Sequence, residues 1–196
     1  MVNIALFGTS ADPPTSAHQA ILNWLSHHYD LVAVWASDNP FKSHQTPLEH
    51  RSKMLRLLIE GISPPRGNIS LYQHLSSPRT LETVEQARQH WGLHVDLTLV
   101  IGSDLVTQMP RWYQIDNLLK QLQLLVVSRP GYAIDEAGLE ELRNLGAKVA
   151  IADLEAPAVS STAYRENGDT AVITPPVEDY IHQENLYACQ DAAPNR

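Results

Sequence analysis

Cysteine is nearly absent from this chain, which carries one, Cys189, among its 196 residues. A single thiol excludes a disulfide within the chain and a zinc site built on cysteines, and it suits a reducing compartment. The glycine fingerprint of dinucleotide-binding loops is missing, and so is the serine elbow of hydrolases. The nine histidines show no spacing typical of a metal site.

Long apolar runs and basic clusters are missing as well. The first apolar run, Ile4–Phe7, is too short for a signal peptide or a membrane span, and no basic segment precedes it. Lys and Arg number 14 against 22 Asp and Glu, so the net charge is −8. An acidic surface disfavours nucleic acid, although a few placed cations suffice for a small anion. We expect a cytoplasmic protein that binds neither nucleic acid nor membrane.

Length and composition predict one domain. Hydrophobic residues make up 43% of the chain, which is enough for a substantial core. We assign residues 1–190 to a single domain and residues 191–196 to a frayed tail. The sequence leaves open whether the chain forms a homo-oligomer.

Apolar, strand-like runs alternate with helical patterns along the chain. This alternation predicts an α/β fold, a doubly wound parallel sheet with helices on both faces and right-handed crossovers. In such sheets the ligand lies beyond the carboxyl ends of the strands, where the strand order reverses. The expected strands are residues 2–7, 31–36, 69–72, 97–101, 124–127 and 148–152.

Helices are expected between these strands. One opens at residues 15–18, one ends at Gly92, and others cover about residues 112–121 and 136–145. Thr46-Pro47-Leu48-Glu49 has the form of a capping box with proline at the first helical position. It predicts the start of a helix that runs to Gly61.

The first eighteen residues predict an anion site. The strand breaks at Gly8-Thr9-Ser10 and turns through Asp12-Pro13-Pro14. A helix follows, with Thr15 and His18 in its first turn. Free N–H groups and the dipole of a helix start favour negative charge, so we expect a phosphate here. The alternative is an ordinary strand–helix turn with a solvated histidine.

A second element suited to phosphate lies near the other end of the chain. Ser160-Ser161-Thr162 precedes a short helix, and Arg165 lies one turn inside it, on the same side as Ser161 and Thr162. Hydroxyls, N–H groups and a guanidinium fork can together cradle a polyphosphate. The alternative is a helix cap followed by a surface arginine. Both elements in one chain favour a nucleotide ligand.

Three more residues, of which Asp104 and Lys42 lie in loops that follow strands, are candidates to bind the rest of a nucleotide. Asp104 is placed to contact ribose hydroxyls or to cap a helix. Trp112 could stack on a flat ring of the ligand, although tryptophan more often belongs to a hydrophobic core. Lys42 could lie near phosphates or be a solvated lysine.

Segments spread over the chain match an ordered series of motifs. They are 8–18 (GGTFDPxHxGH), His50-Arg51 with Met54 (HRxxM), 80–83 (TxDT), 100–104 (IIGAD), 110–112 (PxW), 127–132 (VxRPGY), 160–165 (SSTxIR) and 176–187 (PxxVxxYIxxxxLY). In this order they resemble the bacterial nicotinate-nucleotide adenylyltransferases, within the nucleotidyltransferase superfamily. The resemblance runs nearly end to end, and the series is far more specific than any one motif.

The chain departs from the family pattern at several positions. Thr9 and Ala17 stand where the family has glycines, which adds atoms where the backbone approaches the nucleotide. Ala11 replaces a phenylalanine and Glu82 an aspartate. Thr15 takes the place of the first histidine, and its hydroxyl still donates.

The resemblance implies a Rossmann-like sheet with a small C-terminal helical segment. It implies transfer of AMP from ATP to nicotinate mononucleotide, giving deamido-NAD and pyrophosphate, with Mg²⁺ carried by ATP. The alternatives are nicotinamide mononucleotide or phosphopantetheine as acceptor, or a nucleotide-binding protein with weakened catalysis.

The resemblance also implies a role for each site residue. His18, Thr15 and Arg165 are expected to be catalytic. Residues expected to bind the phosphates of ATP are Gly8, Thr9, Ser10, Ser160, Ser161, Thr162 and Arg165. Residues expected to bind the mononucleotide are Lys42, Thr80, Asp104 and Trp112, with Trp112 stacked on the pyridine ring.

Overall fold

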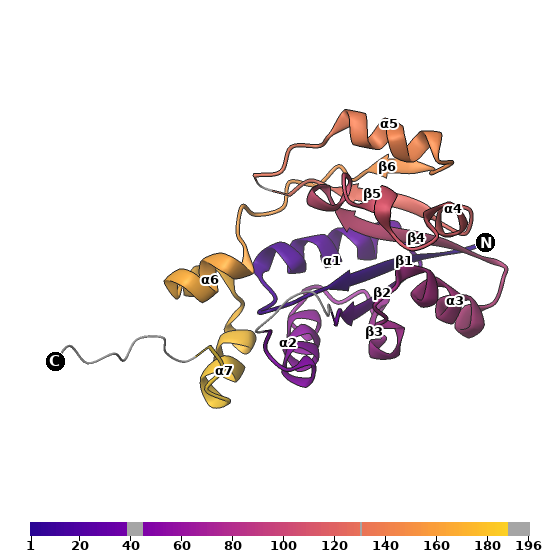
Figure 1. Ribbon diagram of the computed structural model, residues 1–196. Coiled ribbons are helices and arrows are strands. Elements are labelled where there is room, and N and C mark those ends of the chain that lie inside the picture. The colour runs from indigo at the N-terminus through magenta and orange to yellow at the C-terminus, as the bar shows by residue number, and fades with distance from the viewer. Residues whose placement is uncertain (39–44, 130, 188–196) are drawn as a thin grey trace.

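Six parallel strands form one sheet in the computed structural model, which describes residues 1–38, 45–129 and 131–187. The order across the sheet is β3-β2-β1-β4-β5-β6, so it reverses between β1 and β4 (Figure 1). The strands are β1 (Val2–Thr9), β2 (Leu31–Ala36), β3 (Ile69–Leu71), β4 (Val95–Gly102), β5 (Gln123–Val127) and β6 (Val149–Ile151). Each falls on a predicted run, and the predicted doubly wound parallel sheet is confirmed.

Helices connect the strands and cover both faces of the sheet. The α-helices are α1 (Ser16–His28), α2 (Leu48–Glu60), α3 (Thr80–Trp91), α4 (Ile115–Leu119), α5 (Glu136–Asn144), α6 (Ser161–Asn167) and α7 (Pro175–Gln183). Short 3₁₀ turns are η1 (Gln73–Leu75), η2 (Ser103–Leu105), η3 (Met109–Arg111) and η4 (Thr170–Val172). No helix in the described ranges has both the length and the apolar character needed to cross a membrane.

Alternate side chains of each strand point to opposite faces of the sheet. In β1, Ile4 and Leu6 join the apolar cluster that packs against α3, α4 and α5. Ala5 and Phe7 join the cluster that packs against α1 and α2. Because helices cover both faces, the strands read in the sequence as continuous apolar runs rather than as alternating patterns.

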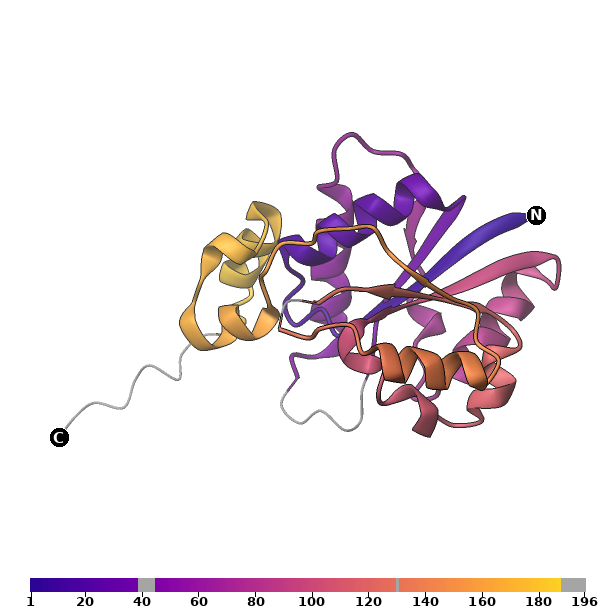
Figure 2. The ribbon, with the colours of Figure 1, turned by 90° about the horizontal axis from the view of Figure 1, so that it is seen from above.

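The last helices form a small unit beside the amino end of α1. Figure 2 shows α6 and α7 grouped together at one side of the sheet. Tyr164 of α6 and Val177 and Ile181 of α7 are buried in the same cluster as α1 and α2. This packing confirms the predicted C-terminal helical segment and attaches it to one face of the sheet.

Two local predictions are wrong. The helix expected over residues 112–121 is the single turn and a half of α4, because Gln114 before it is left-handed, with φ of 49°. The expected capping box is also absent, since α2 begins at Leu48 and its N-cap position is Pro47, with no side-chain hydrogen bond. Instead, the Thr46 N–H donates to the Asp12 carboxylate at 3.3 Å. A tertiary contact therefore takes the place of the local cap.

Candidate active site

The first turn of α1 fixes the orientation of the His18 ring. Its Nδ1 accepts a hydrogen bond from the Thr15 backbone N–H at 3.0 Å and lies 2.9 Å from the Thr15 hydroxyl. Because Nδ1 is an acceptor, the neutral ring carries its proton on Nε2. His18 therefore offers one N–H donor on the side of its ring away from Thr15.

The surroundings of His18 hold the ring in its neutral form. Burial, and then the positive charge of Arg129, lower the pKa of His18 from 6.5 to about 4. Arg129 follows β5 and His18 opens α1, so the loops after two strands meet near this ring. At neutral pH the ring can donate a hydrogen bond while adding no charge of its own.

We expect His18 to stay neutral between about pH 5.5 and 8 in the free protein. Since its folded pKa lies below the unfolded value, the stability it contributes is present above pH 6.5 and is lost as the pH falls from 6.5 towards 4. Proton NMR of the ring, assigned by comparison with His18→Gln, measures the titration. A midpoint near 6.5 would contradict the described environment.

The start of α6 lies against the loop between β1 and α1. The Ser161 hydroxyl donates to the Pro13 carbonyl at 2.7 Å. Arg165 donates to the Asp12 carbonyl and, at 3.2 Å, to the Thr162 hydroxyl. The two elements that the sequence predicts for phosphate are therefore neighbours, and both views show α6 beside the start of α1 (Figures 1 and 2).

Buried Asp12 holds three distant segments together at this place. Its carboxylate accepts hydrogen bonds from the Tyr187 hydroxyl at 2.6 Å and from the Thr46 N–H at 3.3 Å. Burial raises the pKa of Tyr187, and so does its hydrogen bond to Asp12, which keeps the phenol protonated as a donor. The sequence showed Asp12 only as part of a turn, because its partners are 34 and 175 residues away.

Other predicted phosphate residues have structural partners as well. The Ser160 hydroxyl caps α6 and accepts the N–H of Ala163 at 3.2 Å. A β-carbon at Gly8 would lie 2.6 Å from atoms of the Trp35 ring, so packing within the sheet already requires glycine there. Thr9 is the last residue of β1. Whether these residues touch a phosphate stays a prediction.

A buried arginine fixes the loops around the site. Arg51 of α2 is 2% exposed, and its Nε donates to the Thr46 carbonyl at 2.7 Å. Its Nη1 donates to the carbonyls of Ser10 at 2.9 Å and Ser37 at 2.7 Å. One side chain thereby joins the loop after β1, the end of β2 and the segment before α2. It was noticed in the sequence only as part of a motif.

Asp104 forms an ion pair and does not cap a helix. Its carboxylate lies 2.6 Å from the Arg129 guanidinium, and the N-cap position of η2 belongs to Gly102. The Ser103 hydroxyl accepts the Arg129 N–H at 2.9 Å and donates to the Tyr132 carbonyl at 2.8 Å. The capping alternative is therefore wrong, and the ribose contact stays a prediction. In the sequence Arg129 stood out only as part of a motif, although it lies two positions beyond β5, just as Asp104 lies two positions beyond β4.

Sequence comparison identifies relatives that match this chain along nearly its whole length. Residues 6–167 match the cytidylyltransferase-like family. The chain is 44% identical to the probable nicotinate-nucleotide adenylyltransferase of Synechocystis sp., covering 95% of this chain and 99% of that protein. It belongs to the nicotinate-nucleotide adenylyltransferase family.

Other members of the nicotinate-nucleotide adenylyltransferase family are more distant. The enzyme of Bacillus subtilis is 26% identical over 95% of this chain and 99% of its own length. The solved Plasmodium falciparum nicotinic acid mononucleotide adenylyltransferase complexed with NaAD superposes with a TM-score of 0.82, covering 95% and 98% of the two chains. At 23% identity this likeness shows a shared fold.

Two of the predicted mononucleotide residues, Thr80 and Trp112, lie on the α3 side of the sheet. Thr80 is the first residue of α3. Trp112 directly follows η3, and its half-buried side chain packs against the cluster beneath α3. The triphosphate elements, in contrast, lie at the start of α1 on the other face. Lys42, Cys189 and the expected tail, 191–196, fall outside the described residues.

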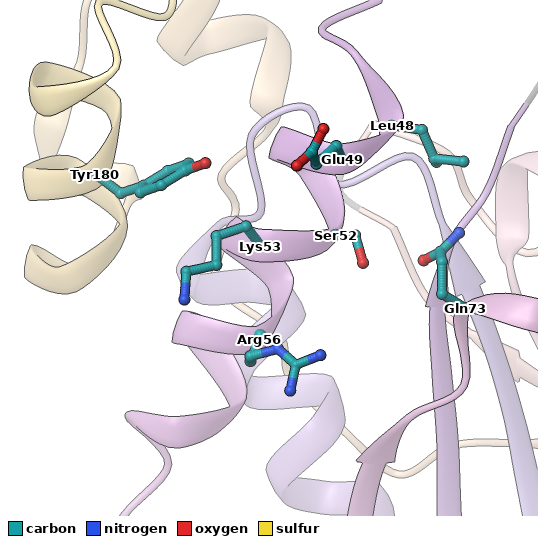
Figure 3. Close-up of a pocket in the computed structure, with 7 residues that line it drawn as sticks. All are labelled: Leu48, Glu49, Ser52, Lys53, Arg56, Gln73 and Tyr180. Atoms are coloured by element: carbon teal, nitrogen blue, oxygen red, sulfur yellow. The ribbon is translucent and has the colours of Figure 1, made fainter.

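A separate open pocket of about 600 Å³ is lined by α2 together with one residue each of η1 and α7. Figure 3 shows its lining side chains, which are Leu48, Glu49, Ser52, Lys53, Arg56, Gln73 and Tyr180. None of the residues predicted for the active site lines this pocket. Within the described ranges, no group of three or more His, Cys, Asp or Glu side chains is arranged to hold a metal ion.

Proposed function

We propose that this chain transfers AMP from ATP to nicotinate mononucleotide in NAD biosynthesis, in the cytoplasm. A phosphate oxygen of the mononucleotide attacks the α-phosphorus of ATP. The bond from that phosphorus to the bridging oxygen breaks, and pyrophosphate leaves. The attacking phosphate is already ionised at neutral pH, so the reaction needs no general base. Catalysis then depends on positioning the reactants and stabilising charge.

The contact between α6 and the β1–α1 loop carries this proposal. Ser161 and Arg165 donate to the carbonyls of Pro13 and Asp12, so donors from both ends of the chain border one surface. On this surface the Nε2–H of His18 would donate to the α-phosphate as negative charge builds, with Thr15 and Ser10 assisting. Further phosphate contacts would come from the residues Gly8, Thr9, Ser160, Ser161, Thr162 and Arg165.

The mononucleotide would bind across the carboxyl end of β1, where the strand order reverses. Trp112 would stack on the pyridine ring, and Asp104 would bind the ribose. Thr80 and Lys42 would also contact the mononucleotide. In this arrangement ATP and the mononucleotide bind on opposite sides of the carboxyl end of β1. Their phosphates then meet between them.

Mg²⁺ would arrive as part of the ATP substrate. Two carboxylates of the proposed site already have partners, since Asp12 accepts from Tyr187 and Asp104 pairs with Arg129. Mg²⁺ on ATP usually keeps several waters and takes few protein ligands, so this pattern suits a metal held by the triphosphate. Activity should accordingly require added Mg²⁺ together with ATP.

A pyrophosphate-release assay tests the proposed function. The protein is supplied with ATP, Mg²⁺ and, in turn, nicotinate mononucleotide, nicotinamide mononucleotide and phosphopantetheine. We expect the fastest release with nicotinate mononucleotide. Faster release with another acceptor would reassign the substrate. Tight ATP binding with no release in any reaction would instead indicate a nucleotide-binding protein without this activity.

Substituting Arg165 by lysine should lower kcat/KM for ATP by about tenfold to a hundredfold, because a point charge cannot replace the guanidinium fork. Steady-state kinetics at saturating mononucleotide measure the change. Arg143→Lys is the matched control, since Arg143 is an exposed residue of α5 whose described ion pair is with Glu140. Equal kinetics in Arg165→Lys and wild type would identify Arg165 as a plain surface residue.

A further inference from the structure

Arg79 joins the two segments proposed to hold the mononucleotide. Its guanidinium carbon lies 4.3 Å from the centre of the Tyr113 ring. Arg79 directly precedes Thr80, the first residue of α3, and Tyr113 directly follows Trp112. A cation is therefore held where the start of α3 meets the loop that carries Trp112, the residue proposed to stack on the pyridine ring.

The charge of Arg79 remains accessible to a ligand. Its side chain is 54% exposed, and its one ion pair among the described residues is with Glu82 at 3.5 Å. Glu82 is itself 42% exposed and also accepts the Ser77 hydroxyl. A long ion pair between exposed groups is worth little, so an anion that presents two oxygens to the guanidinium fork can compete with it.

Stacking on Tyr113 holds the guanidinium in place before any ligand binds. An arginine on an aromatic face gains cation–π attraction, and fixing the long side chain in advance lowers the entropy lost on binding. Another cation of the proposed site, Arg129, is already paired with Asp104 at 2.6 Å. Arg79 is thus better suited than Arg129 to take a new carboxylate.

We propose that Arg79 recognises the carboxylate on the pyridine ring and makes this enzyme prefer nicotinate over nicotinamide mononucleotide. The two acceptors differ at one group, a carboxylate in the first and an uncharged amide in the second. The carboxylate can accept two charge-assisted hydrogen bonds from the guanidinium, whereas the amide oxygen accepts weaker ones. This inference rests on the proposed function, because it assumes that the mononucleotide lies against Trp112.

The test compares kcat/KM for both mononucleotides, at saturating ATP and Mg²⁺, in wild type, Arg79→Met and Arg111→Met. Arg111 is the matched control, because it is exposed, directly precedes Trp112 and has no side-chain partner among the residues that the structure describes. In Arg79→Met we expect kcat/KM for nicotinate mononucleotide to fall about tenfold to a hundredfold. The value for nicotinamide mononucleotide and the KM for ATP should change less than about twofold. Arg111→Met should keep the wild-type ratio.

The possible results distinguish a failure of this inference from a failure of the proposed function. If wild type prefers nicotinate and Arg79→Met keeps that preference, or loses activity equally with both acceptors, the role of Arg79 is wrong while the function stands. If wild type releases no pyrophosphate with either mononucleotide, the proposed function fails and this inference fails with it. Calorimetric binding of nicotinate mononucleotide gives a second readout, and an equal Kd in wild type and Arg79→Met would also overturn the proposal.

Discussion

Replacing His18 by alanine should slow pyrophosphate release by about 10²–10³-fold at saturating substrates, the usual effect of losing one donor to charge that develops in the transition state. The ring is neutral, with its pKa lowered to about 4, and its Nδ1 already accepts the Thr15 N–H. Only Nε2–H is left to donate. Negative charge on the α-phosphate grows during the reaction. His18→Ala should therefore lower kcat by a larger factor than it lowers the affinity for ATP.

A histidine on the same helix provides the control for His18. His27 lies in the last turn of α1, where its ring contacts the Asn23 carbonyl at 2.8 Å. His27→Ala should keep turnover close to wild type. His18→Gln, which retains an N–H donor, should recover part of the loss. Turnover near wild type in His18→Ala would remove the imidazole from the mechanism.

Replacing Arg51 by methionine should lower the free energy of unfolding by about 3–5 kcal/mol. Methionine fills much of the same volume, yet it leaves the partly buried carbonyls of Ser10, Ser37 and Thr46 without the donors that now reach them at 2.7–2.9 Å. Unsatisfied buried acceptors cost about 1–3 kcal/mol each, and part of that cost is relieved when the loops relax towards water.

Urea unfolding followed by circular dichroism measures the effect of Arg51→Met. Arg56→Met is the matched control, because Arg56 is an exposed residue of the same helix. We expect the control to stay within about 0.5 kcal/mol of wild type. A loss of less than about 1 kcal/mol in Arg51→Met would show that the three loops hold their places without this side chain.

The sheet could be predicted from the sequence because both of its faces are covered. Strands buried on both sides appear as unbroken apolar runs, and all six lie where such runs occur. The capping of α2 and the extent of α4 could not be predicted. A contact from Asp12 to Thr46 replaces the local cap, and a left-handed Gln114 interrupts the helical pattern.

That the two predicted phosphate elements lie near each other could also be expected, since the ends of parallel strands meet at one edge. The detailed connections of the site could not be expected. The hydrogen bond between Tyr187 and Asp12 joins residues 175 positions apart, and no local pattern specifies it. The charge that lowers the pKa of His18 comes from Arg129, on a loop that follows a different strand. Such pairs depend on how the elements pack.

The convergence of two donor clusters on one triphosphate is tested most directly by a crystal structure with a non-hydrolysable ATP analogue and Mg²⁺. We predict that Nε2 of His18 and the guanidinium of Arg165 both lie about 3 Å from oxygens of the same triphosphate. A triphosphate bound elsewhere, for example beside Lys53 of α2, or one that touches only one of these two side chains, would contradict the account.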